Sequence, residues 1–125
     1  MIDLGSDWQT YFRFRDEFEE ALDPVRYTLH WLDEQVLTGE FMVWGTLRAA
    51  ILCKIEHYPT GARDIHGMLA AGDLETIVEK LIPDAEEWAR EQGCIGSKIE
   101  SRAGWVRVLK GAGYELHQST LRKDL

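Results

Sequence analysis

Residues 63–93 read RDIHGMLAAGDLETIVEKLIPDAEEWAREQG, the pattern of a buried strand that runs into a long helix. The segment 63–71 is short and apolar in its second half, and Gly72-Asp73 then breaks the pattern, which is typical of a strand that ends in a tight turn. Asp73 is a favourable N-cap, and apolar residues recur at three- and four-residue steps until Gly93, a C-terminal stop. Pro83 is expected to bend this helix toward solvent.

Two more strands and a short helix are expected after this helix. The segment 94–100 (CIGSKIE) is predicted to be a strand, 102–110 (RAGWVRVLK) a short helix and 114–121 (YELHQSTL) a last strand. We expect the strands 63–71 and 94–100 to be parallel neighbours, because a helix of about 20 residues is the usual right-handed crossover between such strands. Trp88 and Trp105 should both be largely buried.

Helices and then strands precede the central segment. One helix is predicted over 8–22, where Asp23-Pro24 ends it, and a second over 28–37. Strands are predicted over 40–45 and 49–58, and the turns around the second strand are short enough to make an antiparallel meander with 63–71. The predicted fold class is therefore α+β, a mixed central sheet with N-terminal helices, a crossover helix and a C-terminal strand-helix-strand, in one domain over 1–125.

Composition limits the classes of function. The chain has 125 residues, and 14 Lys plus Arg against 22 Asp plus Glu give a net charge of -8, which disfavours nucleic-acid binding. It has no apolar run long enough to span a membrane, and its start, MIDLGSDW, carries acids where a secretion signal carries Lys or Arg, so we expect a cytoplasmic protein. Cys53 and Cys94 lack CxxC spacing and are predicted to be buried free thiols, with no metal site.

Three polar residues gather near the hairpin formed by 49–58 and 63–71. They are Glu56, His57 and His66. Glu56 and His66 are candidate catalytic residues, because a carboxylate and an imidazole can be tuned for acid-base work near neutral pH. The alternative interpretation is that all three are exposed hairpin residues.

The order of predicted elements resembles the Gcn5-related N-acetyltransferase (GNAT) fold. The stretches GDLETIVEKLIPDAEEWAREQGC and ESRAGWVRVLKGAGYELHQSTLRKDL are most similar to short acyltransferase-like proteins encoded in phage and prophage genomes. The shared features are the EWAR-x-x-GC helix end, the R-x-GW-x-RVL short helix and the GY start of the last strand. The resemblance covers roughly residues 41–125.

This resemblance implies a place for acetyl-CoA and a set of departures from the family pattern. In active members a Gln/Arg-x-x-Gly-x-Gly/Ala loop and the following helix N-terminus hold the cofactor pyrophosphate. The matching cofactor-binding residues are Leu69, Ala70, Ala71, Gly72, Asp73 and Leu74. Only Gly72 keeps the pattern, while Asp73 and Glu75 place two carboxylates in the first helical turn. Leu109 stands at the position of the family's proton-donating Tyr, and Arg102 at that of the Asn that opens the short helix.

Two functions therefore follow from the sequence. The first is an acyl-CoA-dependent N-acetyltransferase with a degenerate cofactor loop, in which Glu56 or His66 acts as base and backbone groups of 69–72 hold the thioester carbonyl. The second is a non-catalytic GNAT-fold phage structural or accessory protein that serves as a binding or assembly module. Its partner would be a virion protein, another protein or a second copy of the chain, and its location the host cytoplasm or the virion.

Overall fold

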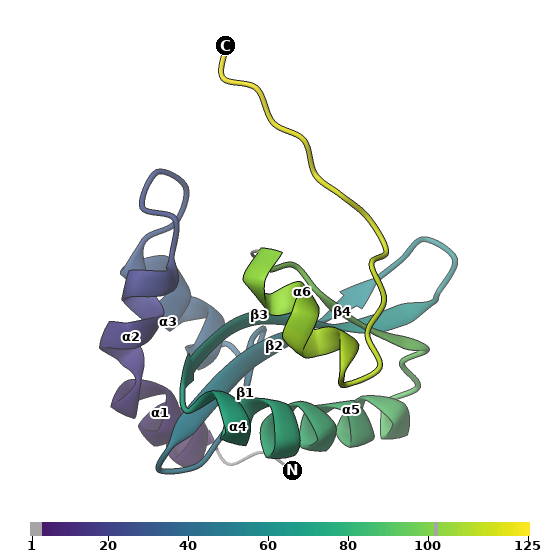
Figure 1. The fold of residues 1–125 in the computed structure, drawn as a ribbon. Helices are drawn as coiled ribbons and strands as arrows, with labels where there is room; N and C mark the ends of the chain where they lie inside the picture. Colours follow the sequence, from purple (N-terminus) through teal and green to yellow (C-terminus); the bar gives the residue numbers. More distant parts are fainter. Residues whose placement is uncertain (1–3, 102) are drawn as a thin grey trace.

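The computed structural model describes residues 4–101 and 103–125. A four-stranded sheet lies at the centre, with helices packed on both of its faces (Figure 1). In chain order the elements are α1 (Leu4–Arg13), α2 (Arg15–Ala21), α3 (Leu29–Leu37), β1 (Met42–Gly45), β2 (Ala49–His57), β3 (Arg63–Gly72), α4 (Leu74–Thr76), the π-helical turn η1 (Ile77–Leu81), α5 (Ile82–Glu91), β4 (Gly96–Ile99) and α6 (Ala103–Lys110).

The sheet has the strand order β1-β2-β3-β4. β1 and β2 are antiparallel, as are β2 and β3, so the predicted meander is confirmed. β3 and β4 are parallel neighbours, and the continuous helical segment 74–91 connects them, as the sequence predicts. The predicted α+β fold with a mixed sheet is therefore the one observed.

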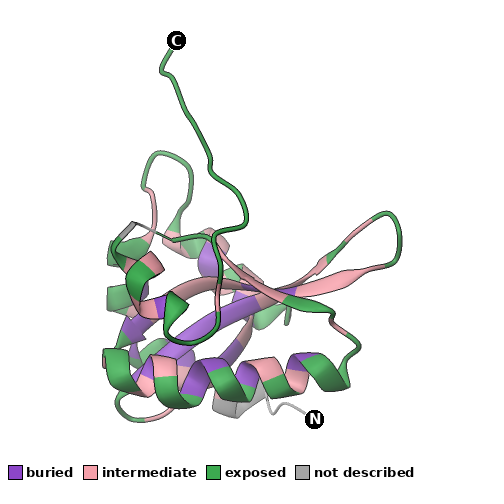
Figure 2. Ribbon diagram, turned by 45° about the vertical axis from the view of Figure 1, so that its right-hand side comes forward, coloured by how far each residue is buried: buried purple, intermediate pink, exposed green. Residues whose placement is uncertain are grey.

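Each face of the sheet carries its own hydrophobic cluster. The first cluster lies under the N-terminal helices and contains Tyr11, Phe14, Phe18, Leu32, Val36, Phe41, Val43, Ala50, Leu52 and Ala71. The second lies under α4–α6 and contains Ala49, Ile51, Cys53, Ile65, Ile77, Leu81, Ile82, Ala85, Ala89 and Leu109. Figure 2 shows buried residues concentrated in the strands and on the inward faces of the helices. Trp88 and Trp105 pack against the second cluster but stay partly exposed, so the prediction that they are largely buried is met only in part.

The N-terminal helix predicted over 8–22 is broken into α1 and α2. Phe14 takes φ -112° and ψ 13° between them and is buried. The helices on both sides of the break bind Asp33 of α3. The Tyr11 hydroxyl of α1 donates a hydrogen bond to the Asp33 carboxylate at 2.6 Å, and the Arg15 guanidinium of α2 makes a bidentate ion pair with it at 2.9 and 2.7 Å. A single straight helix is therefore replaced by two short ones that share an anchor on α3.

The helix predicted over 73–93 contains a π-helical turn just before Pro83. Within this turn the Ile82 N–H donates to the Ile77 carbonyl, five residues earlier. Pro83 has no N–H, and its ring would clash with the carbonyl four residues before it in a regular α-helix. The wider turn accommodates this proline inside the helix, where the sequence alone suggests a bend.

The last strand predicted over 114–121 does not form. Residues 115–125 have no strand partner among the described residues, and all of them are exposed. The alternation of apolar residues that begins with Tyr114 and Leu116 is not continued by Gln118 and Thr120, so the segment has no apolar stripe to bury against its own chain. It runs outward from the body instead (Figure 1).

Candidate functional site

The two parallel strands β3 and β4 separate partway along their length. Their pairing runs from Asp64 opposite Gly96 to Gly67 opposite Ile99, where β4 ends. β3 continues to Gly72, so 68–72 have no strand partner on the β4 side within the described part of the chain. We call this opening the fork. Its edge is a row of backbone groups of the kind that binds extended, amide-containing ligands.

A β-bulge in β3 lies at the mouth of the fork. Leu52 of β2 pairs with Leu69, but the next residue, Cys53, pairs with Gly67, so Met68 is an extra residue on β3. A bulge bends its strand and increases the local twist, which explains why β3 turns away from β4 at this point. At Gly67 an added Cβ would lie 3.2 Å from the Ile99 side chain, so glycine lets the two strands come close just before they part.

A polar cluster lies on the first-cluster face of the sheet, around His66, two residues before the extra residue Met68. His66 pairs in register with Lys54 on one side and Lys98 on the other, and paired residues share a face. The imidazole is 8% exposed, with Nδ1 3.5 Å from Glu56 Oε2 and Nε2 3.7 Å from Glu100 Oε1. Both separations are too long for strong hydrogen bonds, and His66 Nδ1 is buried without a hydrogen-bond partner.

The environment keeps this histidine neutral. Burial, together with the positive charge of Lys98, lowers the pKa of His66 below its usual 6.5, against the opposing pull of Glu100 and Glu56. Partial burial raises the pKa of Glu56, but the nearby Lys54, Lys98 and His66 outweigh it and hold that pKa below its ordinary value. A neutral imidazole beside the ionised Glu56 carboxylate is the state that a general base requires at pH 7.

The two sequence-predicted catalytic residues are thus brought together, and the third polar residue of the hairpin is not. Glu56 and His66 meet in the cluster, whereas His57 lies exposed at the end of β2, opposite Arg63. Sequence reasoning missed Glu100 and Lys98, which reach the cluster only because β4 pairs with β3. The alternation along 96–100, with Lys98 and Glu100 on one side, is the signal that could have indicated them.

The predicted cofactor-binding residues form a strand end and a helix cap. Leu69, Ala70, Ala71 and Gly72 belong to β3, Asp73 is the N-cap, and Leu74 begins α4. The Asp73 carboxylate accepts from the Thr76 N–H at 2.9 Å and from the Thr76 hydroxyl at 2.6 Å. These bonds lower the pKa of Asp73, so the cap is an anion at neutral pH.

The predicted cofactor-binding residues therefore fit the extended amide arm of acetyl-CoA but not its pyrophosphate. The fork offers an open backbone edge to the extended amide arm that carries the thioester. The start of the helix does not fit a pyrophosphate, because the Asp73 carboxylate already takes the Thr76 N–H and its charge repels an anion. Exposed Glu75, in the same turn, adds a second negative charge.

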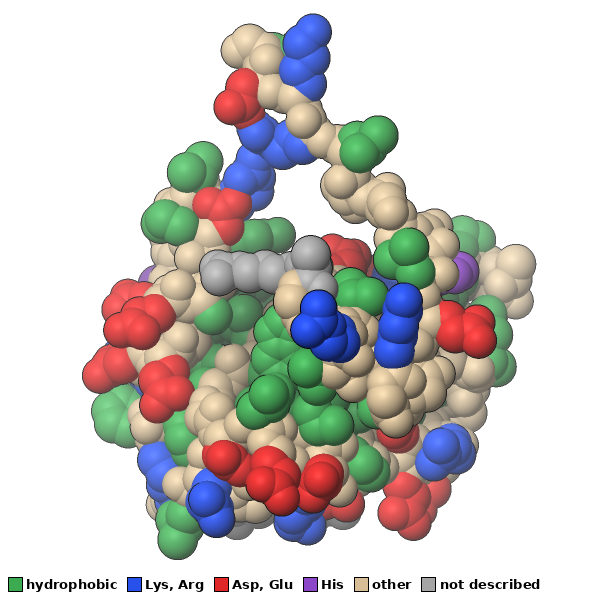
Figure 3. Space-filling model, in the orientation of Figure 1, with side chains coloured by type: hydrophobic (Ala, Val, Ile, Leu, Met, Phe, Trp, Pro, Cys, Tyr) green, Lys and Arg blue, Asp and Glu red, His purple; other side chains and the backbone are tan. Residues whose placement is uncertain are grey.

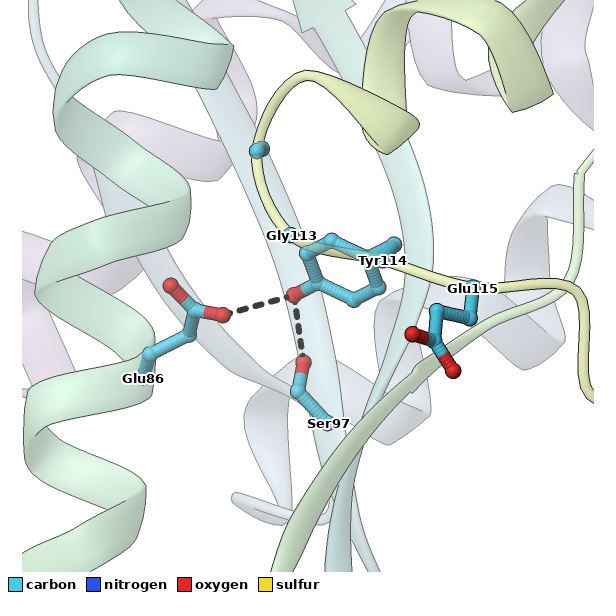
Figure 4. Close-up of a pocket in the computed structure, with 6 residues that line it drawn as sticks. Glu86, Ser97, Gly113, Tyr114 and Glu115 are labelled. Atoms are coloured by element: carbon cyan, nitrogen blue, oxygen red, sulfur yellow. Dashed lines mark hydrogen bonds between the residues drawn. The ribbon is translucent and has the colours of Figure 1, made fainter.

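The position of the family's proton-donating Tyr is filled by a core residue. Leu109 is 5% exposed in the second cluster, and Arg102 lies outside the described residues. The nearby Tyr114 hydroxyl donates to Glu86 at 3.0 Å and accepts from Ser97 at 2.6 Å, and the three side chains line a shallow pocket (Figure 4). Burial, first of all, raises the pKa of Tyr114. Through these hydrogen bonds Tyr114 links α5, β4 and the segment after α6.

The two thiols differ in burial. Cys53 is buried in the second cluster, and burial raises the pKa of its thiol to about 12. Cys94 is only partly buried and lies just before β4, not inside it, so the prediction of two buried thiols in strands holds for Cys53 alone.

Charge is unevenly spread over the surface. On the face shown in Figure 3, acidic side chains gather over the N-terminal helices and along the lower edge, and basic side chains lie over α6. None of the helices in the described residues is long and apolar enough to cross a membrane.

Several solved structures with a similar fold are described as acetyltransferases. The chain matches a ribosomal-protein-alanine N-acetyltransferase from Brucella melitensis with a TM-score of 0.70 and 11% identity, over 99% of this chain and 96% of that one. It matches a GCN5-related N-acetyltransferase from Ralstonia eutropha with a TM-score of 0.69 and 15% identity, over 98% and 95%. A predicted acetyltransferase with acetyl-CoA from Clostridium acetobutylicum gives 0.65 and 12%, over 98% and 92%.

At 11–15% sequence identity, the similarity to these structures shows the fold alone. No family model matches the sequence, and no curated protein matches it closely enough to count as a relative. The chain therefore has the GNAT-like acetyltransferase fold over nearly its whole length.

Proposed function

We propose that this chain is an N-acyltransferase that moves an acyl group from a thioester such as acetyl-CoA to a primary amine, with His66 as the general base. The observation that carries the proposal is the position of His66, a buried imidazole flanked by Glu56 and Glu100 at the mouth of the fork. The acetyltransferases of the same fold support it.

The two ring nitrogens of His66 have separate tasks. Nδ1 is buried toward Glu56, whose carboxylate would stabilise the imidazolium once it forms. Nε2 faces Glu100, which is 76% exposed and can move aside for an acceptor. Nε2 accepts the proton that the amine loses as its nitrogen forms the new C–N bond, while the C–S bond breaks and the sulfur leaves as a thiolate.

The backbone edge of β3 would orient the acyl donor. When bound, the thioester supplies an activated carbonyl carbon, and those backbone N–H groups of 68–72 that face away from β2 could donate to its oxygen. Leu109 cannot protonate the departing sulfur, so solvent must do so. Because the helix cap does not fit a pyrophosphate, we expect acetyl-CoA to bind weakly and to act at millimolar concentration.

The test is amide formation measured by mass spectrometry. The purified chain is incubated with millimolar acetyl-CoA and a panel of primary amines, including a lysine-containing peptide and a polyamine. His66→Gln should lose about 10²- to 10⁴-fold in rate, as expected for removal of a general base. The matched control is His57→Gln, an exposed histidine on the same hairpin, which should keep the wild-type rate. The acidic limb of kcat/KM should lie below pH 6.5, since the pKa of His66 is lowered.

A second candidate function is a non-catalytic module that binds another protein, as a phage structural or accessory protein. The Asp73 cap favours it, because the carboxylate fills the place where this fold would receive a pyrophosphate. Amide formation that does not exceed the uncatalysed rate for any amine, or that is unchanged in His66→Gln, would overturn the enzyme proposal and leave the binding module.

A further inference from the structure

Two charged side chains beside His66 have no partner of opposite charge within the described residues. Lys98 pairs in register with His66, so the two side chains leave neighbouring strands about 5 Å apart on the same face. Its ammonium forms no ion pair in this part of the chain and lies 5.9 Å from the centroid of the Tyr58 ring. Glu100 lies 3.7 Å from His66 Nε2 and likewise meets no Lys or Arg.

The other two charges of the cluster balance each other. Glu56 Oε2 lies 3.5 Å from Lys54 Nζ and 3.5 Å from His66 Nδ1. The side chains of Lys54 and Glu56 are 30% exposed, whereas that of Glu100 is 76% exposed and can turn toward a ligand. A ligand that completes the cluster therefore meets one positive and one negative charge.

We infer that the acceptor of the proposed acyl transfer is a free α-amino acid, bound as a zwitterion between Lys98 and Glu100. Its ammonium group lies against Glu100, beside His66 Nε2, and its carboxylate accepts charge-assisted hydrogen bonds from Lys98. Lys98 and Glu100 are two residues apart at the end of β4, about 7 Å along the chain, so both can reach a ligand whose two charged groups share one carbon. This assignment rests on the proposed function, which places the reacting amine at Nε2.

Other primary amines leave one of these charges without a partner. A diamine would bring a second ammonium group toward Lys98, and two like charges repel each other. A lysine side chain within a peptide would satisfy Glu100 but carries no anion for Lys98. An α-amino acid satisfies both residues, which is why the cluster selects it.

Binding is tested first on the full chain, without an acyl donor. Glycine is the zwitterion, because it has no side chain to clash, glycinamide is the matched ligand without a negative charge, and putrescine is a diamine. Titrations at pH 7 follow the His66 ring resonance by NMR, which is identified by its absence in His66→Gln. Glycine should bind about tenfold more tightly than glycinamide, as expected for a hydrogen bond to a charged group, and more tightly than putrescine.

Variants of the two charged residues separate their tasks. Lys98→Met removes the charge and keeps a long unbranched side chain, so it should weaken glycine binding about tenfold and leave glycinamide binding unchanged. Glu100→Gln should weaken the binding of both ligands, because both are ammonium ions. The control Lys80→Met removes a positive charge from η1, on the second-cluster face of the sheet, and should change neither.

Acylation of the same ligands with millimolar acetyl-CoA separates this inference from the proposed function. The ratio of kcat/KM for glycine to that for glycinamide should fall about tenfold in Lys98→Met, and the intrinsic reactivity of the two amines cancels in that comparison. Glycine that binds no more tightly than glycinamide, or a ratio that Lys98→Met leaves unchanged, would overturn the inference even if both amines are acylated. Glycine binding that depends on Lys98 and Glu100, without acylation of any amine, would overturn the acyl transfer and retain the zwitterion site.

Discussion

Gly72 joins β3 to the helix beneath the fork, and Gly72→Ala tests the geometry of that junction. Gly72 has φ +95°, which L-residues rarely adopt, and an added Cβ would lie 2.3 Å from the Arg48 carbonyl oxygen and 2.7 Å from Ala49 Cα. These contacts are with backbone, so the new methyl group cannot be accommodated by a side-chain rotation. The Asp73 N–H donates to the same Arg48 carbonyl at 3.0 Å, so any displacement also disturbs the helix cap.

The expected loss in free energy of unfolding for Gly72→Ala has two parts. The left-handed conformation costs roughly 1–2 kcal/mol for a residue with a Cβ. Overpacking against fixed backbone adds about 1–3 kcal/mol, so the loss in free energy of unfolding should be about 2–5 kcal/mol. Gly61→Ala is the matched control, because Gly61 has φ +90° and no atom within 4 Å of its added Cβ. Gly61→Ala should therefore lose only the roughly 1–2 kcal/mol due to the left-handed conformation.

Urea unfolding of the wild type and both variants measures these losses, provided that the m-values agree. The expected order of midpoints is wild type, then Gly61→Ala, then Gly72→Ala. Equal losses in the two variants would refute the reasoning, because they would mean that the end of β3 does not pack against 48–49 as described.

Two further predictions concern charges. The double variant Asp73→Asn with Glu75→Gln should bind acetyl-CoA more tightly than wild type in low-salt calorimetry. The control Glu91→Gln, at the other end of the same helical segment, should bind it no more tightly than wild type. Wild-type binding in the low micromolar range would show that the two acids do not exclude the pyrophosphate. Asp33→Asn should cost about 2 kcal/mol, because it weakens the charged pair that ties α3 to α2. The hydrogen bond from Arg15 is the main cause that lowers the pKa of the Asp33 carboxyl, so the ionised carboxylate stabilises the fold above its pKa in the unfolded chain, about 4, and this stabilisation is lost as the pH falls further. Asp33→Asn should therefore lose less stability than wild type on acidification. Parallel curves of stability against pH for the two proteins would contradict this.

The sequence by itself determined the parts of this protein that depend on local patterns. The β3 strand, its Gly72-Asp73 end and the following helix were predictable, because alternation, an N-cap and a C-terminal glycine act within a few residues. The meander followed from short turns, and the parallel β3–β4 pair from the length of the crossover between them. The pairing of Glu56 with His66 was also within reach, since both lie on one hairpin.

Only the tertiary structure decided the features that arise where distant segments meet. Lys98 and Glu100 join His66 through the register between β3 and β4, and Met68 becomes a bulge only because β2 and β3 slip by one residue at Leu52. Within the described residues, the outer edge of β4 and the segment after Tyr114 are left unpaired, although the sequence predicts a strand over 114–121. Strand register and edge pairing depend on backbone hydrogen bonds between remote residues, which every sequence can make, so local patterns do not specify which of them form.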